Sequence, residues 1–209
     1  MTGPSTRDLL LDAAARLYAE RGIDNVPVAE IVRTARQRNA SAVQYHIGTR
    51  DDVLFAVMAR HVPVIAARRH ELLERARGTP ATEVRPAAEA IVRPVTEFAQ
   101  RGWRERAYLQ IGSELSGAMD RESADLQELM KQTDGYAAWD LLRERCPGVP
   151  ADLWRVRREI CIVFVGRAAA DRARLLDQGG KGRILSDDRF VGNLVDMVIG
   201  AMTAPSGQG

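Results

Sequence analysis

The sequence predicts an all-α protein, and three observations support that fold class. Apolar residues recur at helical spacing along most of the chain, whereas strand-like alternation is almost absent. Proline, glycine and hydroxyl-bearing residues stand where helices are expected to begin and end. The length of 209 residues suits a small domain joined to a larger one. We therefore expect a small amino-terminal helical domain and a larger helical body.

The first helix is expected to start at a cap formed by Ser5 or Thr6 and to end at Gly22. Its apolar face comprises Leu9, Leu10, Ala13, Leu17 and Tyr18. A second helix follows, because Pro27 suits a first helical turn. The inward positions of that helix are Val28, Ile31, Val32 and Ala35.

A third, short helix is expected between Asn39 and Gly48, with Val43 and Ile47 facing inward. Thr49 then suits the cap of a long fourth helix, about residues 50–77, which Pro63 should kink or break. Further helices are expected at residues 81–100, 103–117, 124–145, 151–178 and 187–203, with Gly135 able to divide the third of these. The tail, residues 205–209, is expected to be disordered.

The stretch from Ile31 to Arg50 carries the main functional signal. It contains no acidic residue and holds Arg33, Arg36, Arg38 and Arg50. The polar side chains clustered among these arginines are Asn39, Ser41, Gln44, Tyr45 and His46. Cations meet phosphates, and amides and hydroxyls meet base edges, so the composition favours binding in a nucleic-acid groove.

The amino-terminal landmarks resemble those of one known family. The segments RDLLLDAAARLYAERG, VAEIV and NASAVQYHIGTRDDVL follow one another as in the DNA-binding domain of TetR-family transcriptional repressors. The chain departs from the family pattern in its turn, where Arg36-Gln37-Arg38 replaces a shorter turn with glycine. It also departs at Pro27, Gln44 and Ile47.

The resemblance implies a helix-turn-helix whose third helix enters the major groove. Gln44 is the best base-reading candidate, because its amide can pair with adenine; Asn39, Ala40 and Ser41 share that first turn and a half. The expected phosphate contacts are Tyr45, His46, Thr49 and Arg50, and the turn residues Arg36 and Arg38 are expected at the DNA backbone or a minor groove. Simpler roles stay open: Asn39 as a helix cap, Tyr45 packed on the first helix, and His46 hydrogen-bonded to the start of the fourth.

The resemblance divides the chain into a DNA-binding domain at residues 1–50, continuing into the helix of about 50–77, and an effector-binding and dimerisation domain at 78–204. Broad apolar faces on the last two helices suggest a partner helix pair, and the resemblance implies a homodimer; the contact candidates are Phe164, Ala168, Leu194 and Val198. A small apolar effector is implied in the body, and its candidate contacts are Phe98, Trp103, Tyr108, Met119, Tyr136, Trp139 and Phe164. Any single one of these residues is more simply explained as ordinary core.

The favoured function is a ligand-responsive repressor that binds a near-palindromic, double-stranded operator as a homodimer. An enzyme is the least favoured class, because no catalytic set, metal-ligand spacing or cofactor motif stands out. The remaining alternative is a helical ligand-binding or dimerisation module without DNA binding, which only the altered turn supports. Since no signal peptide or apolar stretch of about 20 residues is present, we expect a cytoplasmic protein without a membrane partner.

Overall fold

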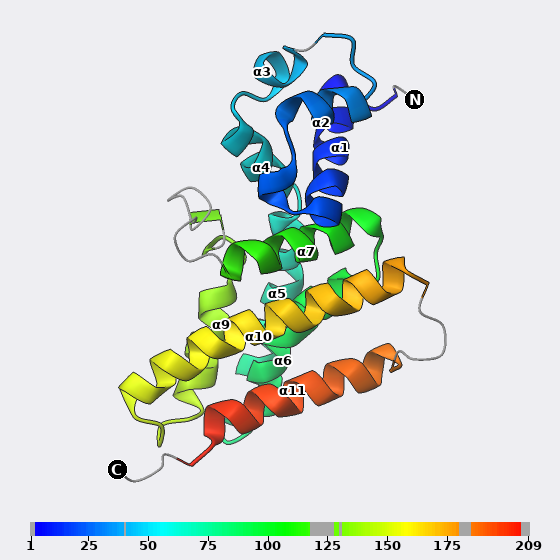
Figure 1. Ribbon diagram of the computed structural model, residues 1–209. Coiled ribbons are helices and arrows are strands. Elements are labelled where there is room, and N and C mark those ends of the chain that lie inside the picture. The colour runs from blue at the N-terminus through cyan, green and yellow to red at the C-terminus, as the bar shows by residue number, and fades with distance from the viewer. Residues whose placement is uncertain (1–2, 40, 118–127, 130, 180–184, 206–209) are drawn as a thin grey trace.

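A computed structural model describes residues 3–39, 41–117, 128–129, 131–179 and 185–205 of the chain (Figure 1). Their regular secondary structure is helical throughout, and no strand occurs within these ranges. The prediction of an all-α fold is confirmed. Within the same ranges, no helix combines the length and the hydrophobicity that crossing a bilayer requires.

The amino-terminal helices lie together at one end of the molecule (Figure 1), and we call them the head. They are α1 (Thr6–Arg21), the 3₁₀ turn η1 (Ile23–Asn25), α2 (Val28–Thr34), α3 (Ala42–His46) and α4 (Arg50–Ala59). α1 starts at the predicted cap, because the Ser5 Oγ accepts a hydrogen bond from the Asp8 N–H at 3.1 Å. It ends as predicted at Gly22, whose φ of +84° favours glycine. The prediction that Leu9 faces inward on this helix is wrong, because its side chain is exposed.

The predicted break in the long fourth helix is confirmed. α4 ends at Ala59, and α5 (Val62–Arg77) begins after a turn at Arg60 and His61. Pro63 lies in the first turn of α5, where its missing N–H leaves no helical hydrogen bond unmade. Thr49 caps α4 as predicted.

The remaining helices form the body. They are α6 (Arg85–Phe98), α7 (Trp103–Gly117), α9 (Gly135–Glu144), α10 (Ala151–Asp177) and α11 (Asp187–Thr203). α7 and α11 have the predicted bounds. α6 starts later than expected, because Pro86 is accommodated in its first turn. The helix expected over 124–145 lies partly outside the described residues, and its described part restarts at Gly135 as anticipated. Residues 206–209 of the expected disordered tail also lie outside them.

Two hydrophobic clusters hold the chain together. The first connects the inner faces of the head helices with α7 and with the end of α10. Tyr18, Ile31 and Ile111 are among its fully buried side chains. The second joins the far half of α5 to α6, α9, α10 and α11. Figure 1 shows α7 lying between the head and the pair α10 and α11. The head therefore packs on α7.

Candidate nucleic-acid interface

The turn between α2 and α3 is closed by backbone hydrogen bonds. The Arg36 N–H donates to the Arg33 carbonyl, and the Gln37 N–H donates to the Val32 carbonyl, both at 3.0 Å. This pattern is a Schellman motif, which requires a left-handed residue at its centre. Arg36 occupies that position with a φ of +55°. The longer turn thus ends α2 in an ordinary way, but with an arginine where glycine is usual.

Replacing Arg36 by glycine is expected to raise the free energy of unfolding by roughly 0.5–1 kcal/mol, because a side chain in the left-handed region is strained. For a chain of this length the melting temperature should rise by about 1–4 °C, measurable by circular dichroism or calorimetry. Replacing Arg38, whose φ is not positive, by glycine is the control and should not stabilise. Equal effects at both positions would contradict the assignment of strain to Arg36.

The short helix α3 separates an inner face from an outer one. Ala42 and Val43 are buried, whereas Gln44, Tyr45 and His46 are exposed. Tyr45 is 83% exposed, which contradicts the alternative that it packs on the first helix. Its ring contacts the His46 imidazole edge-on, with ring centroids 4.8 Å apart. The outer face of α3 therefore presents an amide and two polar rings side by side.

The residues before α3 are also exposed. The Asn39 Oδ1 accepts a hydrogen bond from the Ser41 N–H at 2.9 Å, so this oxygen serves the backbone at the start of the helix. This bond forms a turn just before α3, whose N-cap residue is Ser41 and which has no side-chain capping hydrogen bond. Ser41 is exposed, and Ala40 lies outside the described residues.

At the start of α4, Thr49 and Arg50 both make contacts within the chain. The Thr49 Oγ accepts from the Asp52 N–H at 3.2 Å and donates to the Asp52 carboxylate at 2.8 Å, forming a capping box. Arg50 donates from Nη2 to the Ile23 carbonyl at 2.5 Å and lies 3.8 Å from the Asp24 carboxylate. In the free chain this guanidinium joins α4 to η1, and its side chain is still 41% exposed.

The charges of the head are unevenly compensated. Glu30 lies 3.2 Å from Arg33 and 2.6 Å from Arg21. In the described part of the chain, no carboxylate lies within 4.0 Å of Arg36 or Arg38, and both residues are exposed. A surface with two uncompensated arginines beside α3 attracts anions.

Arg7 is a residue of this surface that the sequence interpretation did not single out. It lies in the first turn of α1, and its Nη1 donates to the His46 carbonyl at 2.8 Å. A cation in a first helical turn opposes the helix dipole, so this placement was a usable signal in the sequence. Arg7 ties the end of α3 to α1.

The aromatic residues expected around an effector are only partly brought together. Tyr108, Tyr136 and Trp139 line a cavity of about 230 Å³ in the body. Phe98 instead packs edge-on against Tyr108 with ring centroids 5.6 Å apart, and Phe164 is a half-buried residue of the second cluster. Met119 lies outside the described residues.

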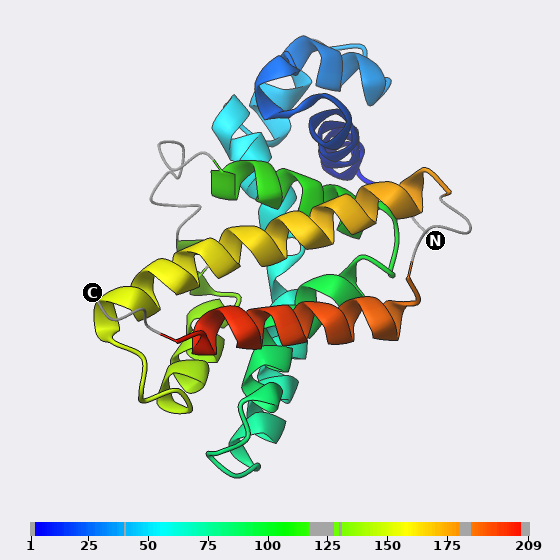
Figure 2. The same ribbon diagram turned by 60° about the horizontal axis from the view of Figure 1, so that its bottom comes forward.

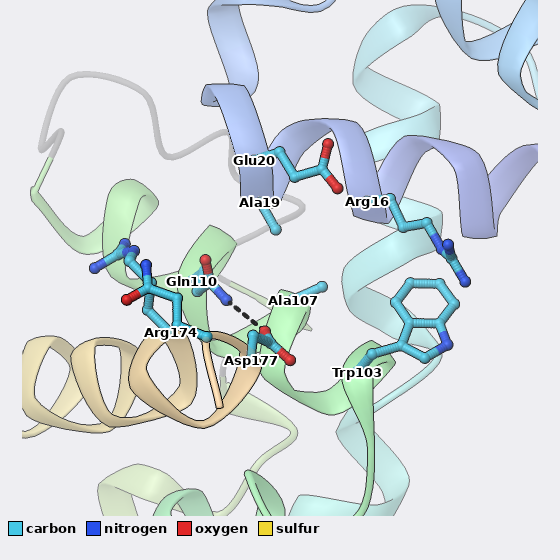
Figure 3. Close-up of a pocket in the computed structure, with 9 residues that line it drawn as sticks. Arg16, Ala19, Glu20, Trp103, Ala107, Gln110, Arg174 and Asp177 are labelled. Atoms are coloured by element: carbon cyan, nitrogen blue, oxygen red, sulfur yellow. Dashed lines mark hydrogen bonds between the residues drawn. The ribbon is translucent and has the colours of Figure 1, made fainter. Parts of the chain in front are cut away.

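Trp103 lies in a different place, the cleft between head and body. Its ring lies 4.1 Å below the Arg16 guanidinium, and Figure 3 shows the two side chains meeting across the cleft between α1 and α7. On the other side of this cleft, Asp177 accepts hydrogen bonds from Arg106 at 2.5 Å and from Gln110 at 3.4 Å. The Arg16–Trp103 contact joins α1 to α7, and the Asp177 contacts join α10 to α7, so this cleft lies at the junction of head and body.

Of the four dimer-contact candidates, two are corrected by the structure. Leu194 and Val198 are buried within a single chain, because their side chains pack in the second hydrophobic cluster. Phe164 and Ala168 are half-buried. The exposed apolar side chains on the same two helices include Val156, Ile160, Val163 and Met197.

Comparison with solved structures finds chains with the same arrangement over nearly their whole length. FadR, a fatty acid degradation regulator from Bacillus halodurans, matches with a TM-score of 0.58 and 16% identity over 96% of this chain and 97% of its own. AibR, solved with isovaleryl coenzyme A and operator DNA, matches at 0.57 and 18% identity over 92% and 97%. The TetR family transcriptional regulator PfmR from Thermus thermophilus matches at 0.53 and 18% identity over 99% and 100%. No protein-family model matches the sequence, and no curated protein matches it.

Proposed function

We propose that this chain, which has the fold of TetR-family transcriptional regulators, is a sequence-specific DNA-binding regulator. The observation that supports the proposal most directly is the acid-free, exposed surface formed by the α2–α3 turn and the outer face of α3. We infer that the chain represses from a near-palindromic operator as a homodimer and responds to a ligand. A catalytic role is not part of the proposal.

In the proposed complex, α3 is the recognition helix. Gln44 reads a base edge, because it is exposed on α3 and its amide can both donate and accept. Arg36, Arg38, Tyr45 and His46 surround it and contact phosphates. Arg50 acts indirectly by holding α4 against η1. Asn39 contributes its amide N–H groups, since its oxygen is used by the backbone.

A homodimer is supported by an exposed apolar stripe on the helix pair α10 and α11. Figures 1 and 2 show these helices side by side on one face of the body. Val156, Ile160 and Val163 follow one another at helical spacing on α10, and Met197 is exposed on α11. A second copy that covers this stripe forms a four-helix arrangement and places two heads on two half-sites.

We assign DNA binding to a domain of residues 1–50 with the helix that follows. Effector binding and dimerisation are assigned to the domain of residues 78–204. The effector site is the cavity beside Tyr108, Tyr136 and Trp139. A helical module that binds no DNA is the competing function. The closed α2–α3 turn argues against a module without DNA binding, because the extra turn residue leaves α2 and α3 packed against the other helices of the head.

The proposal is tested by a mobility-shift assay with the DNA upstream of the chain's own gene, at several salt concentrations. Wild-type protein should bind, with an affinity that falls steeply as salt rises. Gln44→Ala should weaken operator binding by roughly 1–3 kcal/mol and leave non-specific binding nearly unchanged. Arg38→Ala should weaken binding to all sequences. It should also reduce the slope of log affinity against log salt concentration by the amount that about one phosphate contact contributes.

Arg75→Ala is the matched control, because it also removes an exposed arginine but lies in the last turn of α5. It should bind like wild type. Absence of binding by wild-type protein at low salt would favour the module without DNA binding.

A further inference from the structure

Residues from five helices line the cavity in the body. α5, α6, α7, α9 and α10 contribute Arg69, Ile91, Ser113, Trp139 and Ile162, respectively. Its volume of about 230 Å³ is smaller than the roughly 300–1,000 Å³ of pockets for drug-sized ligands. Its occupant is therefore a small molecule with an apolar part.

Arg69 is the unusual member of this lining, because it is a cation that is only 6% exposed. Its Nε donates to the Ala90 carbonyl at 3.2 Å, and its Nη1 donates to the Thr133 carbonyl. Among the described residues, none accepts a hydrogen bond from Nη2, and no carboxylate lies within 4.0 Å of the guanidinium. Burying a cation without a paired counter-charge is costly, so a ligand that supplies the charge gains binding free energy.

The protonation states suit an anion. Burial lowers the pKa of Arg69 to about 10, so the guanidinium is still a cation at neutral pH. Burial also raises the pKa of Tyr108 to about 12, so this phenol is neutral and can donate a hydrogen bond. Because Arg69 and Tyr108 line the same cavity, a cation and a hydroxyl donor serve one anionic group there.

We propose that the cavity binds a small carboxylate with an apolar group, whose carboxylate pairs with the free edge of Arg69. The apolar group packs against Ile91, Trp139 and Ile162. The assignment of this acid as the effector rests on the proposed function, whereas the binding itself does not. It adds an anionic group to the small apolar effector expected from the sequence.

A chain of aromatic contacts links the cavity to the head. Tyr108 lies 5.4 Å from the His61 ring and 5.6 Å from the Phe98 ring, measured between centroids. His61 stands at the break between α4 and α5, and its ring lies 5.4 Å from that of Phe98. An acid beside Tyr108 therefore lies one ring contact away from His61 in the turn between α4 and α5.

The test compares phenylacetate, benzoate and hexanoate with their uncharged amides in a thermal-denaturation assay on the full chain. At about a hundredfold excess over its Kd, a binding acid should raise the wild-type melting temperature by about 5 °C or more, and its amide should not. Arg69→Gln should abolish the shift. Arg68→Gln is the matched control: it removes the same charge from the neighbouring position, where Arg68 is paired with Glu97 at 2.7 Å, and should keep the shift.

Equal shifts by acid and amide, no shift by any acid, or a shift retained in Arg69→Gln would each overturn the proposal. If Arg69→Gln fails to fold, the comparison of acid with amide in wild type decides alone. A mobility-shift assay with the binding acid then tests regulation separately. Acid binding without DNA binding by the free protein rejects the proposed function and leaves the carboxylate site standing.

Discussion

Replacing Ile160 and Val163 together by glutamate is expected to convert the protein to a monomer and to weaken operator binding by about 10²–10⁴-fold. These side chains are 62% and 45% exposed, so the change disturbs no core of the single chain. In the proposed dimer the four introduced carboxylates would face one another across an apolar interface. Desolvation and like-charge repulsion then oppose association. The loss is large because each head alone contacts only one half-site.

Sedimentation or light scattering measures the association state, and the mobility-shift assay measures operator affinity. Leu175→Glu is the control, since Leu175 is also exposed on α10 but lies about 18 Å farther along the helix than Val163. It should leave both measurements unchanged. A double variant that stays dimeric would place the interface elsewhere on the body.

Replacing Gly48 by alanine is expected to lower the free energy of unfolding by roughly 2–3 kcal/mol, and the melting temperature by about 4–12 °C. Gly48 has a φ of +127°, a region that side chains rarely adopt. An added Cβ would also collide with the Asp52 carboxylate, which completes the capping box with Thr49. Because Gly48 joins α3 to α4, the strain should also displace the recognition helix and weaken operator binding.

Gly148→Ala is the matched control for stability, because an added Cβ there meets no atom within 4 Å and its φ is not positive. Circular dichroism on both variants measures the melting temperatures. A Gly48→Ala protein that melts and binds like wild type would show that the α3–α4 junction relaxes without effect.

The sequence interpretation succeeded where local interactions decide structure. The α1 cap at Ser5, the end at Gly22 and the break at Pro63 follow from hydrogen bonds or backbone limits that involve residues a few positions apart. The surface residues around α3 were also predictable as a group, because they are contiguous in the chain. Their exposure on one small helix agrees with the expectation for Gln44 and Tyr45.

The errors concern residues whose partners are distant in the chain. Leu194 and Val198 have the same apolar character as Ile160, and periodicity does not distinguish an inner face from a face that awaits a second copy. The contacts of Arg50 with the Ile23 carbonyl and of Trp103 with Arg16 on α1 also join residues far apart in the chain, and the sequence did not indicate them.

By itself, the sequence determined the all-α class, the helix bounds near their caps and the acid-free turn beside α3. These features depend on neighbouring residues, and local backbone and capping energies suffice to set them. Only the tertiary structure decided which apolar faces are covered, that Arg50 bonds the Ile23 carbonyl, and that Arg69 stands in a cavity with no described carboxylate in contact. Those outcomes depend on how five helices pack around one space, which no local pattern specifies.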